Sequence, residues 1–123
     1  MMRRNMDVNI GLKVYKTSDF IRKTASGEMD LARSIKAVRK LADAADYHRD
    51  CNILIDVRET QSTISHIEQM KLAMEFGNYR HLFHNKIAIL IPPASDRIEK
   101  ANLMKRCMEA DGFAIKVFLD FEH

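Results

Sequence analysis

The sequence predicts an α/β fold, with one mixed sheet and three helices in the order β-β-α-β-α-β-α-β. Three observations lead to this prediction. Residues 8–14 alternate between apolar and polar types, and residues 53–55 and 87–91 form continuous apolar runs. Alternation is typical of a half-buried strand, whereas continuous runs are typical of strands buried on both faces. Segments of helical periodicity separate these strands, so we expect parallel strands joined by right-handed crossovers.

The first two strands are expected to form an antiparallel hairpin. Val8, Ile10, Leu12 and Val14 supply the apolar side of the first strand. Residues 17–19 are turn formers, residues 20–25 read as the second strand, and Gly27 breaks that pattern. The hairpin makes the predicted sheet mixed.

Three helices are expected to follow. The first spans residues 30–46, where apolar side chains recur every three or four positions. The second begins after Ser65 and ends near Gly77, with an inner stripe of Ile67, Met70, Ala73 and Met74. The third begins at a cap formed by Ser95 and Asp96, buries Ala101, Met104 and Met108, and is closed by Gly112. Residues 86–91 and 113–119 read as the last two strands.

Length and composition predict one domain over residues 1–123, with residues 1–7 disordered. The net charge of +3 is too small for a nucleic-acid-binding surface. No apolar run approaches the roughly 18 residues that cross a bilayer, so we expect no membrane insertion. Cys51 and Cys107 lie far apart and form no CxxC pair, which favours a reduced, cytoplasmic setting.

Residues 52–65 contain the candidate site. The apolar run ends at Asp56, a polar segment follows, and Ser65 with Glu68 forms a capping box that starts the second helix. Parallel sheets usually bind ligands at the carboxyl ends of their strands, where this segment lies. The candidate binding or regulatory residues are Asp56, Arg58, Ser62, Ser65 and His66.

Motifs for common enzyme chemistry do not occur in the sequence. The glycines form neither GxGxxG nor GxxxxGK[ST], and there is no GxSxG. His81 and His84 are three residues apart, but no further ligands complete a zinc site. We therefore predict no catalytic residues, no metal and no cofactor.

The sequence resembles the STAS superfamily, in particular its small SpoIIAA-like bacterial proteins. The similarity covers residues 8–121 and rests on the strand order and three motifs: Ile53-Leu54-Ile55-Asp56-Val57-Arg58, Lys86-Ile87-Ala88-Ile89-Leu90 and Val117-Phe118-Leu119-Asp120. These motifs are core patterns, so the resemblance implies a fold more strongly than an activity.

The resemblance also implies a regulatory role for one serine. In phosphorylated family members, a serine nine residues after the Asp caps the following helix, and here that position is Ser65. Ile64 and His66 differ from the family's acidic and small neighbours. A phosphate on Ser65 would lie at a helix N-terminus, with Arg58 on the same segment to pair with it.

The resemblance bears on oligomeric state as well. Family chains usually continue past the last strand into a further helix. Without that helix, a second copy of the chain could cover the exposed sheet face, which would give a homodimer.

Two functions are consistent with these observations. The first is a non-catalytic interaction or regulatory module that binds a protein partner through residues 56–65 and the following helix. The second is a carrier of a small ligand (lipid or nucleotide) or a minor enzyme, with a pocket between the second helix and the sheet. Asp56, Arg58, His66 and His84 are the polar candidates for that pocket, with His66 as the candidate acid or base.

Overall fold

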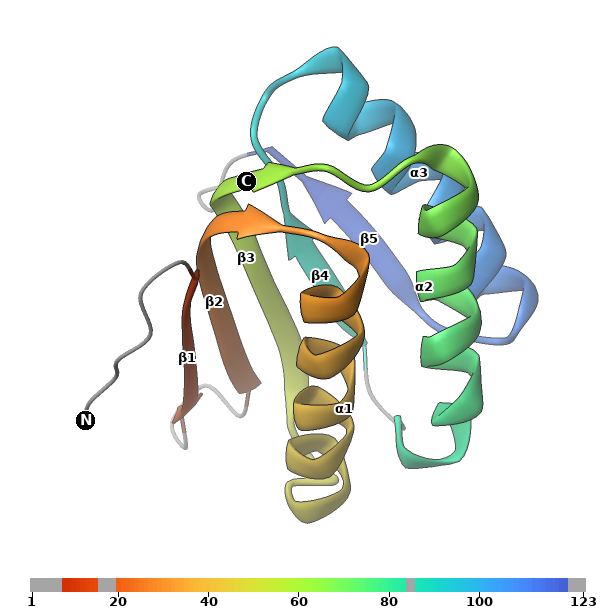
Figure 1. The fold of residues 1–123 in the computed structure, drawn as a ribbon. Helices are drawn as coiled ribbons and strands as arrows, with labels where there is room; N and C mark the ends of the chain where they lie inside the picture. The colour runs from red at the N-terminus through yellow and green to blue at the C-terminus, as the bar shows by residue number, and fades with distance from the viewer. Residues whose placement is uncertain (1–7, 16–19, 84–85, 120–123) are drawn as a thin grey trace.

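A five-stranded sheet carries three helices on one of its faces (Figure 1). The structure is a computed structural model that describes residues 8–15, 20–83 and 86–119. Its elements are β1 (Val8–Tyr15), β2 (Phe20–Met29), α1 (Leu31–Tyr47), β3 (Asn52–Ser62), α2 (His66–Asn78), a short 3-10 turn (Arg80–Leu82), β4 (Ile87–Leu90), α3 (Ser95–Ala110) and β5 (Ile115–Phe118). The predicted order of strands and helices is confirmed.

The strands lie in the order in which they occur in the chain, β1-β2-β3-β4-β5. β1 pairs antiparallel with β2, which confirms the predicted hairpin, and β2 to β5 pair parallel. Each crossover between parallel neighbours contains one helix. Because successive crossovers of the same hand progress in one direction across the sheet, all three helices cover the same face.

The main core lies between the helices and the sheet. Ile21, Leu41, Ile87 and Met108 are almost fully buried there. Burying each such side chain contributes roughly 1.5–3 kcal/mol. At one end of the core, the rings of Phe76, Phe83 and Phe113 lie 5.7–6.1 Å apart, in tilted and edge-on contacts.

The sequence places the end of β3 wrongly. We expected a polar loop directly after Asp56, whereas the strand continues to Ser62 and pairs with a longer β2 up to Met29. The pairing shifts on the way, because Thr24 lies opposite Asp56 and Ser26 lies opposite Glu59. β3 thus contains an extra residue in a bulge. The partner strand satisfies the backbone of this polar segment, which local sequence does not reveal.

The predicted inner face of α2 is also wrong. Ala73 is buried as expected, but Ile67, Met70 and Met74 are 68%, 46% and 69% exposed. The buried residues are instead Gln69, Leu72, Ala73 and Phe76. Packing of the Phe76 ring against two other phenylalanines sets the rotation of the helix and leaves the Ile–Met stripe in solvent.

α3 is close to its prediction. Ala101, Met104 and Met108 are buried, and Gly112 follows the helix with a φ of 93°, as expected of a closing glycine. Ser95 is the first helical residue rather than the cap; Ala94 occupies the cap position and offers no side-chain hydrogen bond. In the described part of the chain, no helix has the length and apolar character needed to cross a membrane.

Candidate functional site

A cavity of about 130 Å³ lies between the helices and the sheet, beneath the carboxyl ends of β2, β3 and β4. Most of its wall is apolar and comes from all three helices and from these strands. The apolar side chains include Ala25, Val38, Leu41, Ile55, Val57, Leu72, Phe76, Ile89, Ile91 and Met104. A cavity of this size is comparable to the roughly 150 Å³ engineered cavity that holds benzene. It is therefore large enough for a ligand of about six carbon atoms.

Lys23 is the unusual residue in this wall. It lies on β2 with Ile21 and Ala25 on the same face, and only 3% of it is exposed. Its amine is the one buried side-chain nitrogen or oxygen in the described residues that has no hydrogen-bond partner. Burial, and then the charge of Lys40, lower the pKa of Lys23 from 10.5 to about 8. An uncompensated amine in an apolar wall is costly, so it suggests a partner from outside the chain.

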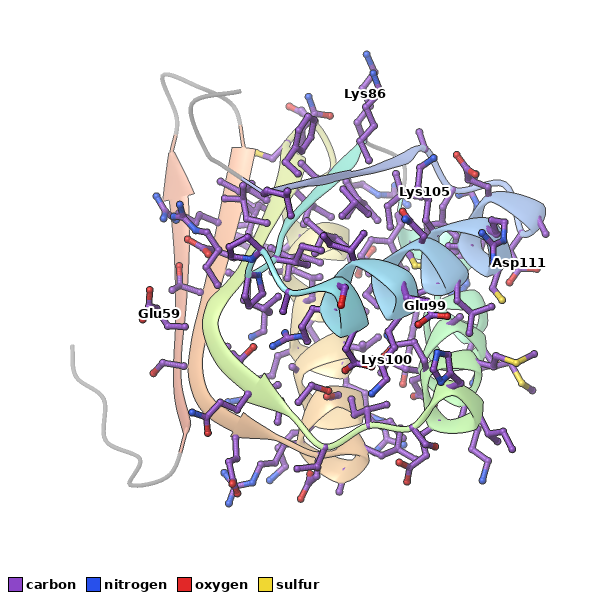
Figure 2. All side chains as sticks on the ribbon, turned by 90° about the horizontal axis from the view of Figure 1, so that it is seen from above. Glu59, Lys86, Glu99, Lys100, Lys105 and Asp111 are labelled. Carbon is purple, nitrogen blue, oxygen red and sulfur yellow. The ribbon has the colours of Figure 1, made fainter. Side chains whose placement is uncertain are left out.

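Two further cations line the cavity, and both have partners. Arg97 donates from Nη1 to the Thr60 carbonyl and from Nη2 to Thr60 Oγ1, each at 2.8 Å. Lys100 Nζ lies 3.2 Å from an Asp96 carboxylate oxygen. Figure 2 shows Lys100 reaching from α3 toward the space between α1 and α2. Among the residues that the structure describes, three cations and no acidic side chain line the cavity.

The bulge in β3 supplies the hydroxyl groups of the cavity. Before the bulge, odd-numbered residues such as Ile55 face the helices; after it, Thr60 and Ser62 do so. Glu59 points away from the helices (Figure 2). Thr60 Oγ1 donates to the Val57 carbonyl at 2.6 Å, and Ser62 Oγ accepts from the Ile64 amide at 3.2 Å. Without the extra residue, the two hydroxyls would lie on the opposite face of the sheet.

Asp56 and Arg58 lie on the face of the sheet opposite the helices. Asp56 Oδ1 accepts from Arg58 Nε at 2.9 Å, and Oδ2 accepts from Nη2 of both Arg58 and Arg22 at 2.8 Å. The Arg58 amide also donates to Oδ1 at 3.2 Å. These hydrogen bonds, chiefly those of the Arg58 side chain, lower the pKa of Asp56 to about 2, although burial opposes them. The carboxylate is committed to holding β2 and β3 together.

Ser65 caps α2 as the sequence predicts. Its Oγ accepts from the Glu68 amide at 3.1 Å, and the Glu68 carboxylate accepts from the Ser65 amide at 3.0 Å. Arg58 is occupied by Asp56 on the other face, so it does not offer the free guanidinium that we expected for a phosphate on Ser65. His66 is exposed at the start of the helix, with Nε2 3.8 Å from Glu99 Oε1.

The structure therefore separates the residues that the sequence grouped together. Ser62 lines the cavity, Ser65 and His66 lie at the exposed start of α2, and Asp56 with Arg58 lies behind the sheet. Asp56, Arg58 and His66 do not share a pocket. His84 lies outside the described residues. Within those residues, no group of three or more His, Cys, Asp or Glu side chains is arranged to hold a metal ion.

Sequence reasoning missed Lys23, Arg97 and Lys100. Lys23 alone had a local signal: Ile21-x-Lys23-x-Ala25 places a lysine on the apolar side of a strand. Such a position usually indicates a constrained or functional amine. Arg97 and Lys100 join the cavity only through the packing of α3, which no nearby pattern indicates.

Known structures support the fold. A solved structure of an uncharacterized protein from the DUF3478 family with a SpoIIAA-like fold, from Shewanella loihica PV-4, superposes with a TM-score of 0.54. The alignment covers 99% of this chain and 94% of the other, at 18% identity. This chain has a SpoIIAA-like fold. No protein-family profile and no curated protein sequence matches it.

The SpoIIAA-like fold explains where the cavity lies. Its parallel strands bring their carboxyl ends to one edge, and the N-terminal turns of the helices meet there. Ser34, Gln69 and Arg97 reach the cavity from the first turns of α1, α2 and α3. At 18% identity the comparison supports the fold and gives no information on activity. The function is therefore inferred from the cavity itself.

Proposed function

We propose that the protein is a non-catalytic STAS-like binding module whose cavity holds a small acidic molecule with an apolar body. The observation that carries this proposal is the buried amine of Lys23, which has no hydrogen-bond partner and lies in a wall where the described residues supply no carboxylate. A carboxylate of the ligand would supply the missing charge and hydrogen-bond acceptor. A buried cation with such a partner is much less costly than one without.

The hydrogen bonding of the cavity supports a ligand with one acidic group. Arg97 already donates to Thr60 and Lys100 lies beside Asp96, which leaves Lys23 as the cation without a hydrogen-bond partner. A phosphate ester would bring a charge of about −1.5 to −2 into the same apolar space. A monocarboxylate of about six carbon atoms matches both the charge and the volume.

The test compares two probes of equal length, hexanoate and 1-hexanol. At pH 7 we expect hexanoate to bind more tightly than hexanol, by about tenfold, which corresponds to one charge-assisted hydrogen bond. Isothermal titration calorimetry measures both affinities. The substitution Lys23→Met should remove the preference for the acid while hexanol still binds.

Lys36→Met is the matched control, because Lys36 lies on α1 and is exposed. It should leave both affinities unchanged. Equal binding of acid and alcohol to the unmodified protein, or no binding of either, would contradict the proposal.

A second candidate function has its own observation. Ile67, Met70 and Met74 form an exposed stripe at helical spacing on α2, the helix predicted to contact a protein partner. Apolar side chains at i, i+3 and i+7 suit a partner that presents an apolar helix. Cross-linking of partners captured from native lysate should locate contacts on α2. Met70→Glu should abolish those contacts, whereas Lys71→Glu on an adjacent exposed position should retain them.

A further inference from the structure

The amine of Lys23 differs from an ordinary lysine in three respects. Lys23 is 3% exposed, its nitrogen has no partner among the described residues, and it lines a cavity whose wall is mostly apolar. Exposed lysines are hydrated and protonated near neutral pH, so their nitrogen lone pair is not available for bonding. A desolvated lysine in an apolar pocket is the usual form of an amine that reacts with carbonyl groups.

The surroundings favour the uncharged amine. Lys40 of α1 acts on Lys23 through its charge, and the charged side chains that line the cavity with Lys23 are Arg97 and Lys100 of α3. The nearby carboxylate of Asp96 lies 3.2 Å from Lys100 Nζ. The groups that α2 and β3 contribute to the wall are neutral, and Asp56 lies on the opposite face. With a pKa of about 8, roughly a tenth of Lys23 is uncharged at pH 7, about 300 times the fraction of an ordinary lysine.

We propose that Lys23 forms a reversible imine with small apolar aldehydes that enter this cavity. The inference rests on the proposed function, because the same cavity must admit the compound. It goes further in assigning a covalent reaction to the amine. The flexible four-carbon stem of lysine lets the nitrogen turn toward a carbonyl group held beside it.

The reaction needs no oxidant or reductant. The lone pair of the uncharged nitrogen bonds to the carbonyl carbon, and the π electrons of the carbonyl move to its oxygen. A proton passes from nitrogen to that oxygen, which gives a carbinolamine. The nitrogen lone pair then forms the C=N bond as the hydroxyl group leaves with a second nitrogen proton. Amine and aldehyde thus become imine and water, and apolar walls that exclude water favour the imine.

The experiment traps the imine on the full chain with hexanal and sodium cyanoborohydride. The reagent delivers hydride to the imine carbon, which leaves a stable hexyl-amine, and peptide mass mapping locates it. At pH 7 we expect Lys23 to be labelled at least about tenfold faster than exposed Lys36 and Lys116. The rate at Lys23 should rise with pH through about pH 8 and level off about one unit higher, whereas the rates at exposed lysines should keep rising toward pH 10.

Two variants complete the test. Lys23→Met should remove the fast single labelling event, and Lys36→Met should retain it. Mapping of the unmodified protein gives the same answer without a variant, should Lys23→Met not fold. Labelling spread evenly over the exposed lysines, or a rate at Lys23 that follows theirs with pH, would overturn the proposal.

Hexanoate separates this inference from the proposed function. If it binds and slows labelling of Lys23, both are supported. If it binds but hexanal does not label Lys23, the imine proposal fails and the proposed function stands. If hexanoate does not bind and hexanal does not label Lys23, the proposed function and the imine proposal both fail.

Discussion

Asp56 and Arg58, two residues apart on β3, form a bidentate ion pair on the face of the sheet that the helices leave uncovered. Arg58 Nε and Nη2 lie 2.9 and 2.8 Å from the two carboxylate oxygens, and Arg22 of β2 joins the same carboxylate. The Asp56 side chain is only 6% exposed. This pair stabilises the sheet. It takes no part in the cavity, which lies on the opposite face.

Asp56→Asn should lower the free energy of unfolding by about 2–4 kcal/mol, because it leaves two arginines without their shared anion. Urea denaturation at pH 7 measures the change. Glu59→Gln, at an exposed position of the same strand, is the control and should stay within about 0.5 kcal/mol of the unmodified protein. An equal loss in both variants would show that the ion pair is not the cause.

The same pair makes stability depend on acid pH. The pKa of Asp56 is lowered from 3.8 to about 2, so the folded state favours the charged carboxylate. Its contribution is present above pH 4 and is lost as pH falls toward 2, by about 2 kcal/mol. Thermal unfolding of the unmodified protein and of Asp56→Asn over this range should converge as the pH is lowered. Parallel curves would contradict the assigned pKa.

Lys23, unlike Asp56, should destabilise the folded state near neutral pH, and this cost should disappear as the pH becomes alkaline. Its folded pKa of about 8 lies below the ordinary 10.5, so the unfolded chain binds more protons between these values and stability rises with pH across that window. Lys23→Met should remove this rise and increase the free energy of unfolding at pH 7 by about 1–3 kcal/mol, because no buried charge remains. Denaturation of both proteins from pH 7 to 10.5 is the measurement. A variant less stable than the unmodified protein at pH 7 would mean that the amine has a partner.

The capping box of α2 should carry a modest part of the stability. Ser65→Ala removes the acceptor for the Glu68 amide and should cost about 1 kcal/mol, whereas Ser65→Asp should retain most of the stability because aspartate also caps. Thr63→Ala, at an exposed position just before the helix, is the control. Chemical denaturation distinguishes these variants, and equal stability of all three would rule out the cap as a contributor.

The two faces of α2 should respond differently to substitution. Met74→Gln on the exposed stripe should change stability by less than about 0.5 kcal/mol. Leu72→Ala on the buried face should cost about 2–4 kcal/mol through the cavity it leaves. Thermal and urea unfolding measure both. A large loss for Met74→Gln would mean that the stripe is covered in solution.

Much of the fold follows from local sequence patterns. The alternation in residues 8–14, the apolar runs at 53–55 and 87–91 and the capping box at Ser65 predict the element order, because each depends on residues close together in the chain. The closing role of Gly112 is predicted for the same reason. The protein-partner and homodimer predictions, and the regulatory role of Ser65, stay predictions.

The candidate site depended on contacts between distant segments. The bulge in β3 directs the side chains of Thr60 and Ser62 toward the cavity, whereas Asp56 and Arg58 face the other side of the sheet. Packing of α3 brought Arg97 onto Thr60, 37 residues away. The sequence by itself determined which segments become strands and helices, since hydrophobic period and caps are local. Only the tertiary structure decided which polar groups meet, because strand register and helix rotation are set by partners far away in the chain.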